Sequence, residues 1–382
     1  MMNTVSILTS HFLPENTACT NRVLALVNEL SKSNFVKVYS LTTFGVSEQC
    51  ENGALGPNVE IFYCLQKEFS KSSFIIRAFN EIRYCYNLVK LKNRDESDLT
   101  IVTIPYMFLL PVSAFLLRGK KVLDIRDLVW EYLPENNLFS KFAKKIISMV
   151  MVKSIKCFNY IYVTNEVEFA NVNSVVQSNS EVSILSNGVS YKSYNLLSGV
   201  KFIGNAGFSV LYVGNIGYAQ NLQILADAAK YFPDIDFDVV GHGNAFSDLS
   251  NYVKSLGITN FKLHGKKEWI DILDFYGRAN ILYAGLKGNY SSAMPSKLYE
   301  YAVTGKPIIY SGIGQAIDFV SSLENSFTVN PTDVNGLVEA ISLIREQGEY
   351  ISDSNRKLIK ESFIREISCQ RFAERVNEIC DI

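Results

Sequence analysis

The feature that most constrains this fold is a double series of short apolar runs separated by segments with helical spacing. Such runs predict strands buried in a sheet, and strands that alternate with helices predict an α/β fold with mostly parallel sheets. The expected strands lie at 4–9, 35–41, 59–64, 99–104, 121–125, 160–164 and 182–185 in the first series, and at 210–213, 236–240, 261–263, 281–284, 307–310 and 327–329 in the second.

The length of the chain indicates two domains. A chain of 382 residues is too long for one ordinary core. The stretch 190–207 contains Ser198-Gly199 and Gly204-Asn205 and shows little periodicity, so we place the linker there. We expect the first domain to span 1–195 and the second to span 196–361.

Composition excludes several classes of protein. A net charge of −1 carries no signature of nucleic-acid binding. The seven cysteines are scattered and form no Cys-x-x-Cys pair, which predicts reduced thiols in a cytoplasmic protein and no zinc site. The apolar run 101–117 is broken by Pro105 and Pro111, so it predicts a buried strand and a buried helix rather than a membrane span. The run 4–9 is too short, and lacks the basic leader, for a secretion signal.

The segment 294–307 has the residues of a short helix that faces a ligand. Pro295 and Ser296 favour a helix start, where the Ser oxygen can cap backbone N–H groups, and Gly305 favours its end. A helix start suits a phosphate, and Glu300, one turn later, could accept hydrogen bonds from the diol of a ribose. A Ser-capped helix with a solvated Glu is the alternative.

Pro-Ser-Lys-Leu-Tyr-Glu-Tyr at 295–301, followed by Gly-Lys-Pro at 305–307, resembles the nucleotide-sugar motif of glycosyltransferase family 4, whose members are retaining enzymes of the GT-B fold. The resemblance is closest to the branch that builds bacterial O-antigen and capsule units. It implies that Glu300 binds the nucleotide ribose. It also implies that the helix start at Pro295, Ser296 and Leu298, with Lys297 as a cation, contacts the donor.

The resemblance also implies an architecture. GT-B enzymes have two Rossmann-like domains with mostly parallel sheets that face each other across a cleft. The first domain binds the acceptor and the second binds the nucleotide sugar. A C-terminal helix, expected within 362–382, crosses back to the first domain.

Two loops of the second domain depart from the family pattern. The loop at Gly214 normally carries an Arg and, five residues later, a Lys that neutralise the diphosphate, and these positions hold Asn215 and Gln220. Lys287 could replace the missing charge, or be an ordinary surface lysine. The first Glu of the family motif is replaced by Ser292.

Two further loops of this domain are expected near the nucleotide base. Gly241-His242-Gly243 resembles a family turn whose glycines let the backbone approach the cleft. His264 ends the next expected strand.

In the first domain, the resemblance points to two further loops. Asp127 could orient the acceptor hydroxyl and Arg126 could pair with a diphosphate, although a structural Arg–Asp pair is an equal alternative. The loop residues Asn16, Thr17 and Ala18 could offer backbone N–H groups to the donor phosphate, or form an ordinary turn.

The segment 140–157 interleaves lysines with apolar residues. A basic amphipathic helix can lie on an anionic membrane, and it can equally be a domain helix with a charged outer face. Membrane contact would suit a polyprenyl-diphosphate-linked acceptor.

These patterns predict a retaining glycosyltransferase that moves a sugar from a nucleotide-diphosphate sugar, with UDP favoured by family habit, to a lipid-linked or oligosaccharide acceptor of a surface polysaccharide. The nucleotide sugar is a co-substrate, and no cofactor or metal is expected. The predicted location is cytoplasmic, with peripheral contact at the inner membrane face. The alternatives are a GT-B sugar-nucleotide epimerase, which needs more cleft carboxylates and histidines, and an inactive partner of another transferase.

Overall fold

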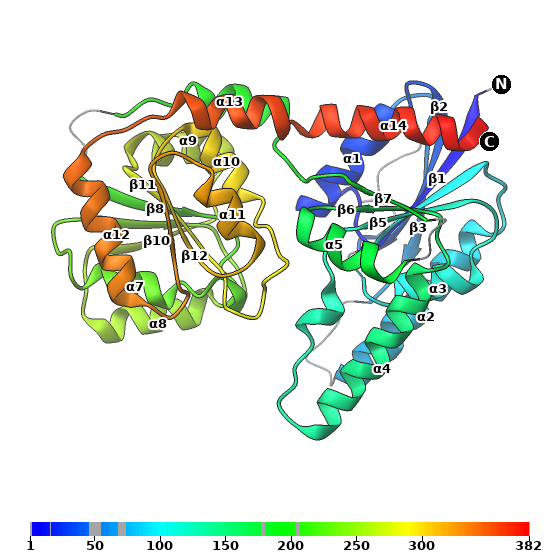
Figure 1. The fold of residues 1–382 in the computed structure, drawn as a ribbon, viewed down its shortest axis with the longest axis horizontal. Helices are drawn as coiled ribbons and strands as arrows, with labels where there is room; N and C mark the ends of the chain where they lie inside the picture. The colour runs from blue at the N-terminus through cyan, green and yellow to red at the C-terminus, as the bar shows by residue number, and fades with distance from the viewer. Residues whose placement is uncertain are drawn as a thin grey trace. The chain divides into compact units, whose positions relative to one another are not determined.

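The computed structural model describes residues 2–15, 17–45, 55–67, 74–104, 106–176, 180–203 and 207–381. The chain forms two compact units (Figure 1). The first unit consists of Met1–Asn187 and Arg365–Ile382, and the second of Gly188–Ile364.

The first unit is built on a seven-stranded sheet in the order β3-β2-β1-β4-β5-β6-β7, and every neighbouring pair is parallel. Its strands are β1 (Asn3–Thr9), β2 (Asn34–Thr42), β3 (Val59–Leu65), β4 (Leu99–Ile104), β5 (Lys121–Ile125), β6 (Tyr160–Val163) and β7 (Glu181–Ile184). Its α-helices are α1 (Ala18–Leu30), α2 (Phe74–Lys92), α3 (Leu109–Leu116), α4 (Leu138–Ile155), α5 (Glu166–Val175) and α14 (Arg365–Asp381). One apolar core lies between the sheet and α1 with α14, and another contains residues of α2, α3 and α4.

The second unit has a six-stranded parallel sheet in the order β10-β9-β8-β11-β12-β13. Its strands are β8 (Ser209–Val213), β9 (Asp236–Val240), β10 (Phe261–Gly265), β11 (Ile281–Gly285), β12 (Ile308–Ser311) and β13 (Ser326–Val329). Its α-helices are α6 (Tyr191–Ser198), α7 (Gln223–Ala229), α8 (Phe246–Leu256), α9 (Trp269–Arg278), α10 (Lys297–Thr304), α11 (Gln315–Ser321), α12 (Val334–Gln347) and α13 (Asp353–Ser362). In both sheets the strand order reverses beside the first strand, as in Rossmann-like folds.

The predicted fold class is confirmed, because both units are α/β with parallel sheets and each expected run overlaps an observed strand. The run 101–117 divides into β4 and α3, as expected. The six cysteines among the described residues carry no disulfide.

The boundary region differs from the sequence-based expectation. The second unit begins at Gly188 rather than at residue 196, and the stretch predicted as a linker contains α6. Ser190 caps this helix by accepting a hydrogen bond from the amide of Ser193 at 3.0 Å. Because α6 buries only Leu197 completely, its sequence carries almost no apolar periodicity. Residues 204–206 lie outside the described residues.

The last helix belongs to the first unit. The chain leaves the second unit after α13, and α14 begins at Arg365, later than the expected start at residue 362. Phe372 and Val376 of α14 are buried in the core shared with α1, and the ring of Phe372 meets that of Tyr162 edge to face, with centroids 4.6 Å apart.

Replacing Phe372 with Ala is expected to lower the free energy of unfolding of the first unit by about 3–5 kcal/mol, because it empties a filled core position. Urea unfolding followed by circular dichroism measures the effect. The matched control is Arg371→Ala, an exposed neighbour on the same helix, which should change stability by less than about 0.5 kcal/mol. Equal effects of the two substitutions would contradict the packing of α14.

Candidate active site

The loops after β8 and β9 are joined by backbone hydrogen bonds at the carboxyl end of the second sheet. The amide of Ile216 donates to the carbonyl of His242 at 3.0 Å, and the amide of Ala245 donates to that of Ile216 at 3.0 Å. Gly241 has a φ of 142°, and a Cβ there would lie 1.8 Å from the carbonyl oxygen of Gly214. Only glycine fits at this place. The edge holds five of the predicted residues, Gly214, Asn215, Gly241, His242 and Gly243.

Helix α10 is fixed against this edge by a tyrosine. The hydroxyl of Tyr301 accepts from the amide of Val213 at 2.9 Å and donates to its carbonyl at 3.3 Å, at the end of β8. Gly305, with a φ of 74°, ends the helix as predicted. The predicted side-chain cap is wrong: Ser296 has helical dihedral angles and its oxygen makes no capping bond, because capping requires a non-helical N-cap.

Lys297 presents a buried ammonium group at the end of β8. Its Nζ lies 3.6 Å from the ring centroid of Tyr212, a cation–π contact, and 2.8 Å from where a Cβ on Gly214 would stand. The Nζ atom is buried and has no hydrogen-bond partner among the residues that the structure describes. Burial lowers the pKa of Lys297 to about 7, although the charge of Glu300 opposes this shift. A group of this kind can receive an anion.

Glu300 lies one helical turn after Lys297 and is half-buried. Ser292, which stands where the family has its first Glu, is buried in the loop between β11 and α10. The amide of Gln315 donates to the carbonyl of Ser291 at 2.9 Å and so holds this loop. The structure therefore provides one carboxylate, Glu300, at the positions of the family's two motif glutamates.

Asn215 and Gln220, which replace the family's basic residues, take part in the loop itself. The Oε1 atom of Gln220 accepts from the amide of Gly217 at 3.1 Å, and the carbonyl of Asn215 accepts from the hydroxyl of Tyr212 at 2.5 Å. Neither side chain carries a charge. Among the described residues, Lys297 is the cation beside Gly214.

Lys287 is exposed on the loop after β11. It lines a cavity of about 60 Å³ together with Gly217, Tyr218 and Asp248. Its amide donates to the carbonyl of Ala219 at 2.8 Å. The structure thus sets Lys287 beside the turn that follows the Gly214 loop.

The two predicted histidines of this unit differ in their surroundings. His242 is exposed and its ring stacks on Phe246, with centroids 4.9 Å apart. His264 is partly buried, and its Nε2 lies 2.6 Å from Oδ1 of Asp238 on the neighbouring strand. His264 therefore already has a carboxylate partner.

In the first unit, Arg126 follows β5 and is only 9% exposed. Its Nη2 donates to Oδ1 of Asn187 at 2.6 Å, whereas Nε and Nη1 are buried and bond to no residue in the described part of the chain. Burial, with the nearby charge of Arg22, lowers the pKa of Arg126 to about 10. Asp127 is exposed.

The ion pair next to Arg126 involves residues that the sequence-based reasoning missed. Arg22 donates to Oδ1 of Asp124 at 2.7 Å and to Oδ1 of Asn187 at 3.0 Å, and Arg22 and Asp124 are almost completely buried. The buried structural Arg–Asp pair in this region is therefore formed by Arg22 and Asp124, and not by Arg126 and Asp127. These residues are far apart in sequence, so no local pattern marks the pair.

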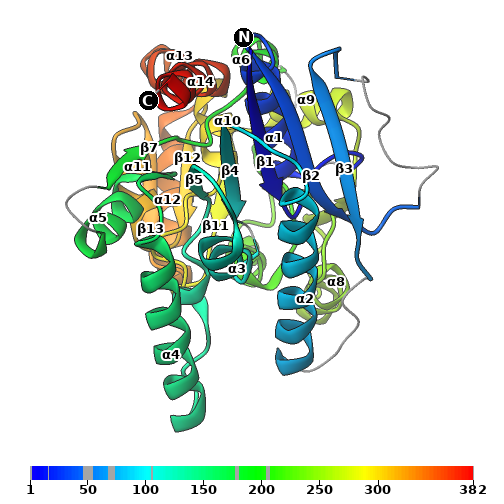
Figure 2. The same ribbon diagram turned by 90° about the vertical axis from the view of Figure 1, so that its right-hand side faces the viewer.

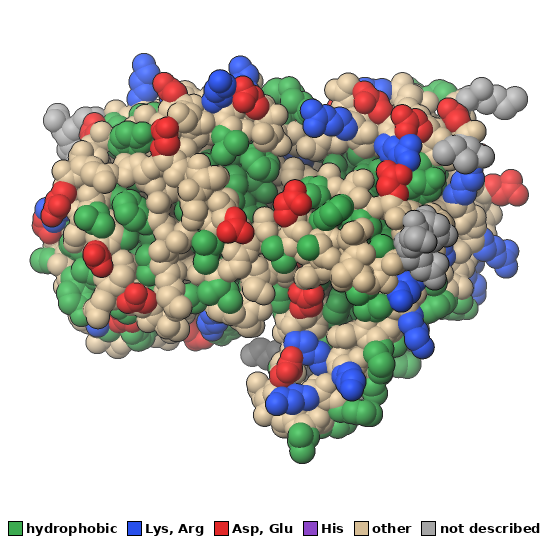
Figure 3. Space-filling view, viewed as in Figure 1, with side chains coloured by type: hydrophobic (Ala, Val, Ile, Leu, Met, Phe, Trp, Pro, Cys, Tyr) green, Lys and Arg blue, Asp and Glu red, His purple; other side chains and the backbone are tan. Residues whose placement is uncertain are grey.

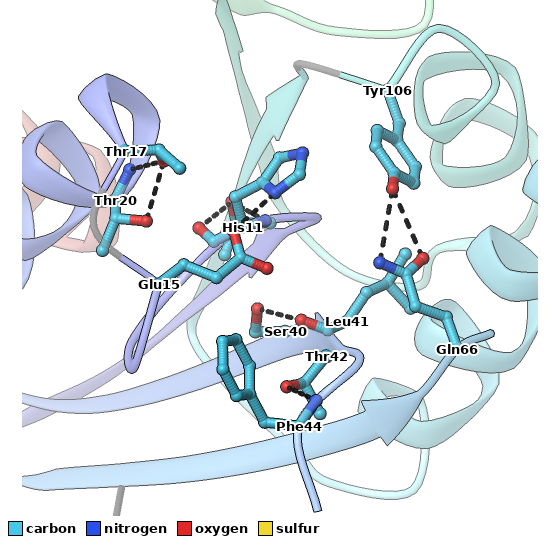
Figure 4. Close-up of polar contacts among 11 residues, drawn as sticks. His11, Glu15, Thr17, Thr20, Ser40, Leu41, Thr42, Phe44, Gln66 and Tyr106 are labelled. Atoms are coloured by element: carbon cyan, nitrogen blue, oxygen red, sulfur yellow. Dashed lines mark hydrogen bonds and ion pairs between the residues drawn. The ribbon is translucent and has the colours of Figure 1, made fainter. Parts of the chain in front are cut away.

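A polar cluster follows β1 and β4, whose carboxyl ends are adjacent (Figure 4). The Nδ1 atom of His11 lies 2.7 Å from Oε2 of Glu15, and its ring meets that of Tyr106 edge to face. Thr17 is exposed and caps α1 by accepting from the amide of Thr20 at 3.1 Å. Ala18 begins the helix and is exposed, and Asn16 lies outside the described residues.

Within the part of the chain that the structure describes, no group of three or more His, Cys, Asp or Glu side chains is arranged to hold a metal ion. Among these residues no helix is long and apolar enough to span a membrane.

Comparison with known proteins agrees with this geometry. Residues 200–363 match the family model of glycosyl transferases group 1. A curated relative, the 2-deoxystreptamine N-acetyl-D-glucosaminyltransferase of Niallia circulans, is 22% identical over 222 residues, which are 55% of this chain and 56% of that protein. The chain thus spans about half the length of the curated relative it matches.

Solved structures resemble the whole chain. A sucrose-phosphate synthase from Thermosynechococcus elongatus superimposes with a TM-score of 0.78 at 14% identity, covering 99% of both chains. Anabaena HepE, solved in complex with UDP and glucose, superimposes with a TM-score of 0.71 at 16% identity, covering 98% of this chain and 99% of that one. At such identities the likeness establishes the fold.

Residues 200–363 therefore match glycosyl transferases group 1, and the fold of the chain is of the GT-B type. The prediction of a glycosyltransferase is confirmed at the level of this match.

Replacing Lys297 with Met is expected to raise the free energy of unfolding of the ligand-free protein, on the order of 1–3 kcal/mol, because it removes a buried ammonium without a partner. The pKa of Lys297 is about 7 in the folded state and ~10.4 when unfolded. The buried charge therefore destabilises the folded protein fully below pH ~7, and this destabilisation decreases as pH rises toward ~10. The gain in melting temperature should follow the same course in calorimetry across this range.

Lys306 is the matched control, since burial lowers its pKa to about 7 as well. Its Nζ, however, donates to the carbonyls of Gly277 and Ala279 at 2.9 and 2.6 Å, at the end of α9. Lys306→Met should therefore destabilise the protein by about 1–3 kcal/mol. The same sign for both substitutions would contradict the assigned environments.

Proposed function

We propose that the chain is a retaining glycosyltransferase of family 4 that transfers a sugar from a nucleotide-diphosphate sugar to a surface-polysaccharide acceptor. A UDP-sugar is the favoured donor, and an O-antigen or capsule unit on a polyprenyl diphosphate is the favoured acceptor. The observation that carries the proposal is the ammonium of Lys297, which is buried beside Gly214 at the carboxyl end of β8 and has no hydrogen-bond partner within the described ranges. Ligands of open α/β sheets bind at this edge.

The donor is proposed to bind to the second unit in two parts. Its diphosphate contacts Lys297 and the start of α10, at Pro295, Ser296 and Leu298, where the helix dipole favours an anion. Its ribose diol donates to Glu300, which can only accept hydrogen bonds when ionised. The base is proposed to lie near Gly241–Gly243 and His264. Binding of UDP and UDP-glucose by HepE, named in the solved complexes, supports this choice of donor.

In the proposed reaction the bond from the anomeric carbon to the diphosphate oxygen breaks, and a bond to the acceptor hydroxyl oxygen forms on the same face of the sugar. The hydroxyl proton passes to the leaving phosphate, so no separate base is required. Lys297 stabilises the negative charge that develops on the leaving group, which is the main need of such a transfer. This protein cation supports a reaction without a metal or other cofactor.

The acceptor is proposed to bind to the first unit. Asp127 is exposed there and can orient a hydroxyl, and the two unpartnered nitrogens of Arg126 can hold an anionic group such as a lipid diphosphate. A lipid-linked acceptor would be met at the cytoplasmic face of a membrane, through the region that includes 140–157.

UDP is expected to raise the melting temperature of the protein by mass action. Glu300→Ala should weaken UDP binding at least tenfold, since a hydrogen bond to a charged group contributes about 1.5–3 kcal/mol. Thermal shift against UDP, GDP and CMP, with and without the substitution, measures both effects. Glu346→Ala, an exposed acid on α12, is the control that should leave the shift intact.

No shift with any nucleotide would overturn the donor assignment. A UDP shift without sugar transfer to lipid-linked acceptors would favour the inactive partner, for which the uncharged Asn215, Gln220 and Ser292 argue. Conversion of the donor sugar without an acceptor would favour the epimerase.

Binding of UDP should also take up a proton. At pH ~8 the side chain of Lys297, with a pKa of about 7, is mostly the neutral amine. An adjacent diphosphate would raise this pKa, so that the amine takes up a proton. Isothermal titration in buffers of different ionisation enthalpy should show uptake approaching one proton. Lys297→Met should abolish the uptake, and a buffer-independent enthalpy in the unsubstituted protein would contradict a diphosphate at this place.

A further inference from the structure

Helix α4 of the first unit carries large apolar side chains that face solvent. Leu138, Phe139 and Phe142 are 87%, 75% and 64% exposed. Ile146, Met149 and Val150 continue this surface. The first fully buried residue of the helix is Met151, so roughly 20 Å of helix precedes it. Figure 3 shows hydrophobic side chains at the end and along one side of this projection.

Helix α2 repeats the pattern, which the sequence-based reasoning missed. Phe79 is 67% exposed, and Ile82 and Tyr86 follow it at intervals of three and four residues, on one side of the helix. α3 packs against both α2 and α4, and its Phe115 and Leu116 are exposed too. Figure 2 shows α2 and α4 extending in the same direction beyond the sheet.

The exposed charges on α2 and α4 themselves have one sign, although Lys144 of α4 pairs at 2.7 Å with Glu135, just before that helix. The exposed cations of α4 are Lys141, Lys145 and Lys153, and the helix contains no Asp or Glu. α2 exposes Arg77, Arg83 and Lys90. Its one acid, Glu81, is turned inward and accepts from the amide of Phe108 at 2.8 Å. Apolar residues interleaved with cations alone are typical of a surface that meets an anionic bilayer.

We propose that α2 and α4 form a two-helix membrane-docking surface, made of Ile76, Phe79, Ile82, Tyr86, Leu138, Phe139, Phe142, Ile146 and Met149 with the cations between them. The apolar side chains enter the headgroup region of an anionic bilayer, while the long basic side chains reach the lipid phosphates. An apolar surface of this extent on a monomer marks an interaction site, and its charge selects lipid rather than a neutral protein surface.

Sedimentation with vesicles tests this proposal. The protein should pellet with vesicles of equal parts phosphatidylcholine and phosphatidylglycerol, and much less with phosphatidylcholine alone. Added salt should weaken the binding, because the phosphate contacts are screened. The double substitution Lys141→Gln/Lys145→Gln should weaken it roughly twenty-five-fold, since each lysine near an anionic surface contributes about fivefold.

Substitutions of the apolar residues separate the two helices. Phe139→Ser/Phe142→Ser on α4 and Phe79→Ser/Ile82→Ser on α2 should each reduce vesicle binding at least tenfold without changing the melting temperature. The matched control is Ile270→Ser on α9, which is 72% exposed but lies in the second unit, and it should bind as the unsubstituted protein does. Phe142→Trp should show a blue-shifted emission only with the anionic vesicles.

Three results would overturn the proposal. In the first, the protein fails to bind the anionic vesicles, and in the second, the phenylalanine variants bind as well as the control does. In the third result, the α4 substitutions reduce vesicle binding while the α2 substitutions leave it unchanged. A dimer in ultracentrifugation that Phe139→Ser/Phe142→Ser converts to monomer would assign the surface to a second copy instead. Vesicle binding is independent of sugar transfer, so these outcomes are distinct from those of the UDP experiments.

Discussion

The hydroxyl of Tyr301 bonds both the amide and the carbonyl of Val213, and the geometry of the second unit's site depends on this contact. Through it a helix of eight residues is held against the last residue of β8, so that its first turn points Lys297 toward the Gly214 loop. The neighbouring loops are fixed by backbone contacts that need glycine at Gly241. The site is thus preorganised by backbone and by one phenol, and few side chains are left to adjust when a ligand arrives.

Lys297 and Lys306 show why residue type alone does not assign a role. Both belong to the motif between Pro295 and Pro307, and burial lowers the pKa of both to about 7. Lys306 satisfies the carbonyls at the end of α9, which makes it a structural cap. Lys297 contacts the face of Tyr212 and feels the charge of Glu300, but its Nζ makes no hydrogen bond to any described residue, so it is left available to a ligand. Gln220 completes the contrast, because its side chain accepts from the amide of Gly217 where the family carries a cation.

Most strands could be predicted from the sequence, because buried parallel strands are continuous apolar runs; β4, β5 and β9 match the expected ranges. Helix α6 was not predicted, because it buries one side chain and so has almost no apolar periodicity. The predicted capping by Ser296 was wrong, because the residue type does not determine the backbone dihedral angles that capping requires. The contacts of Arg22 with Asp124 and Asn187 join three distant segments, which no local spacing reports. The exposed stripe of α2 was missed because an apolar stripe predicts burial unless the partner surface is known to be absent.

The return of α14 to the first unit has a consequence for synthesis on the ribosome. Five buried side chains of the first unit, Cys369, Phe372, Ala373, Val376 and Ile379, emerge only after the whole second unit. The usual order, in which the amino-terminal domain matures first, is therefore reversed here. The second unit is continuous and can finish folding while the first still exposes the apolar groove beside α1. During that interval the nascent chain presents a surface that a chaperone would recognise, and that the helix later covers.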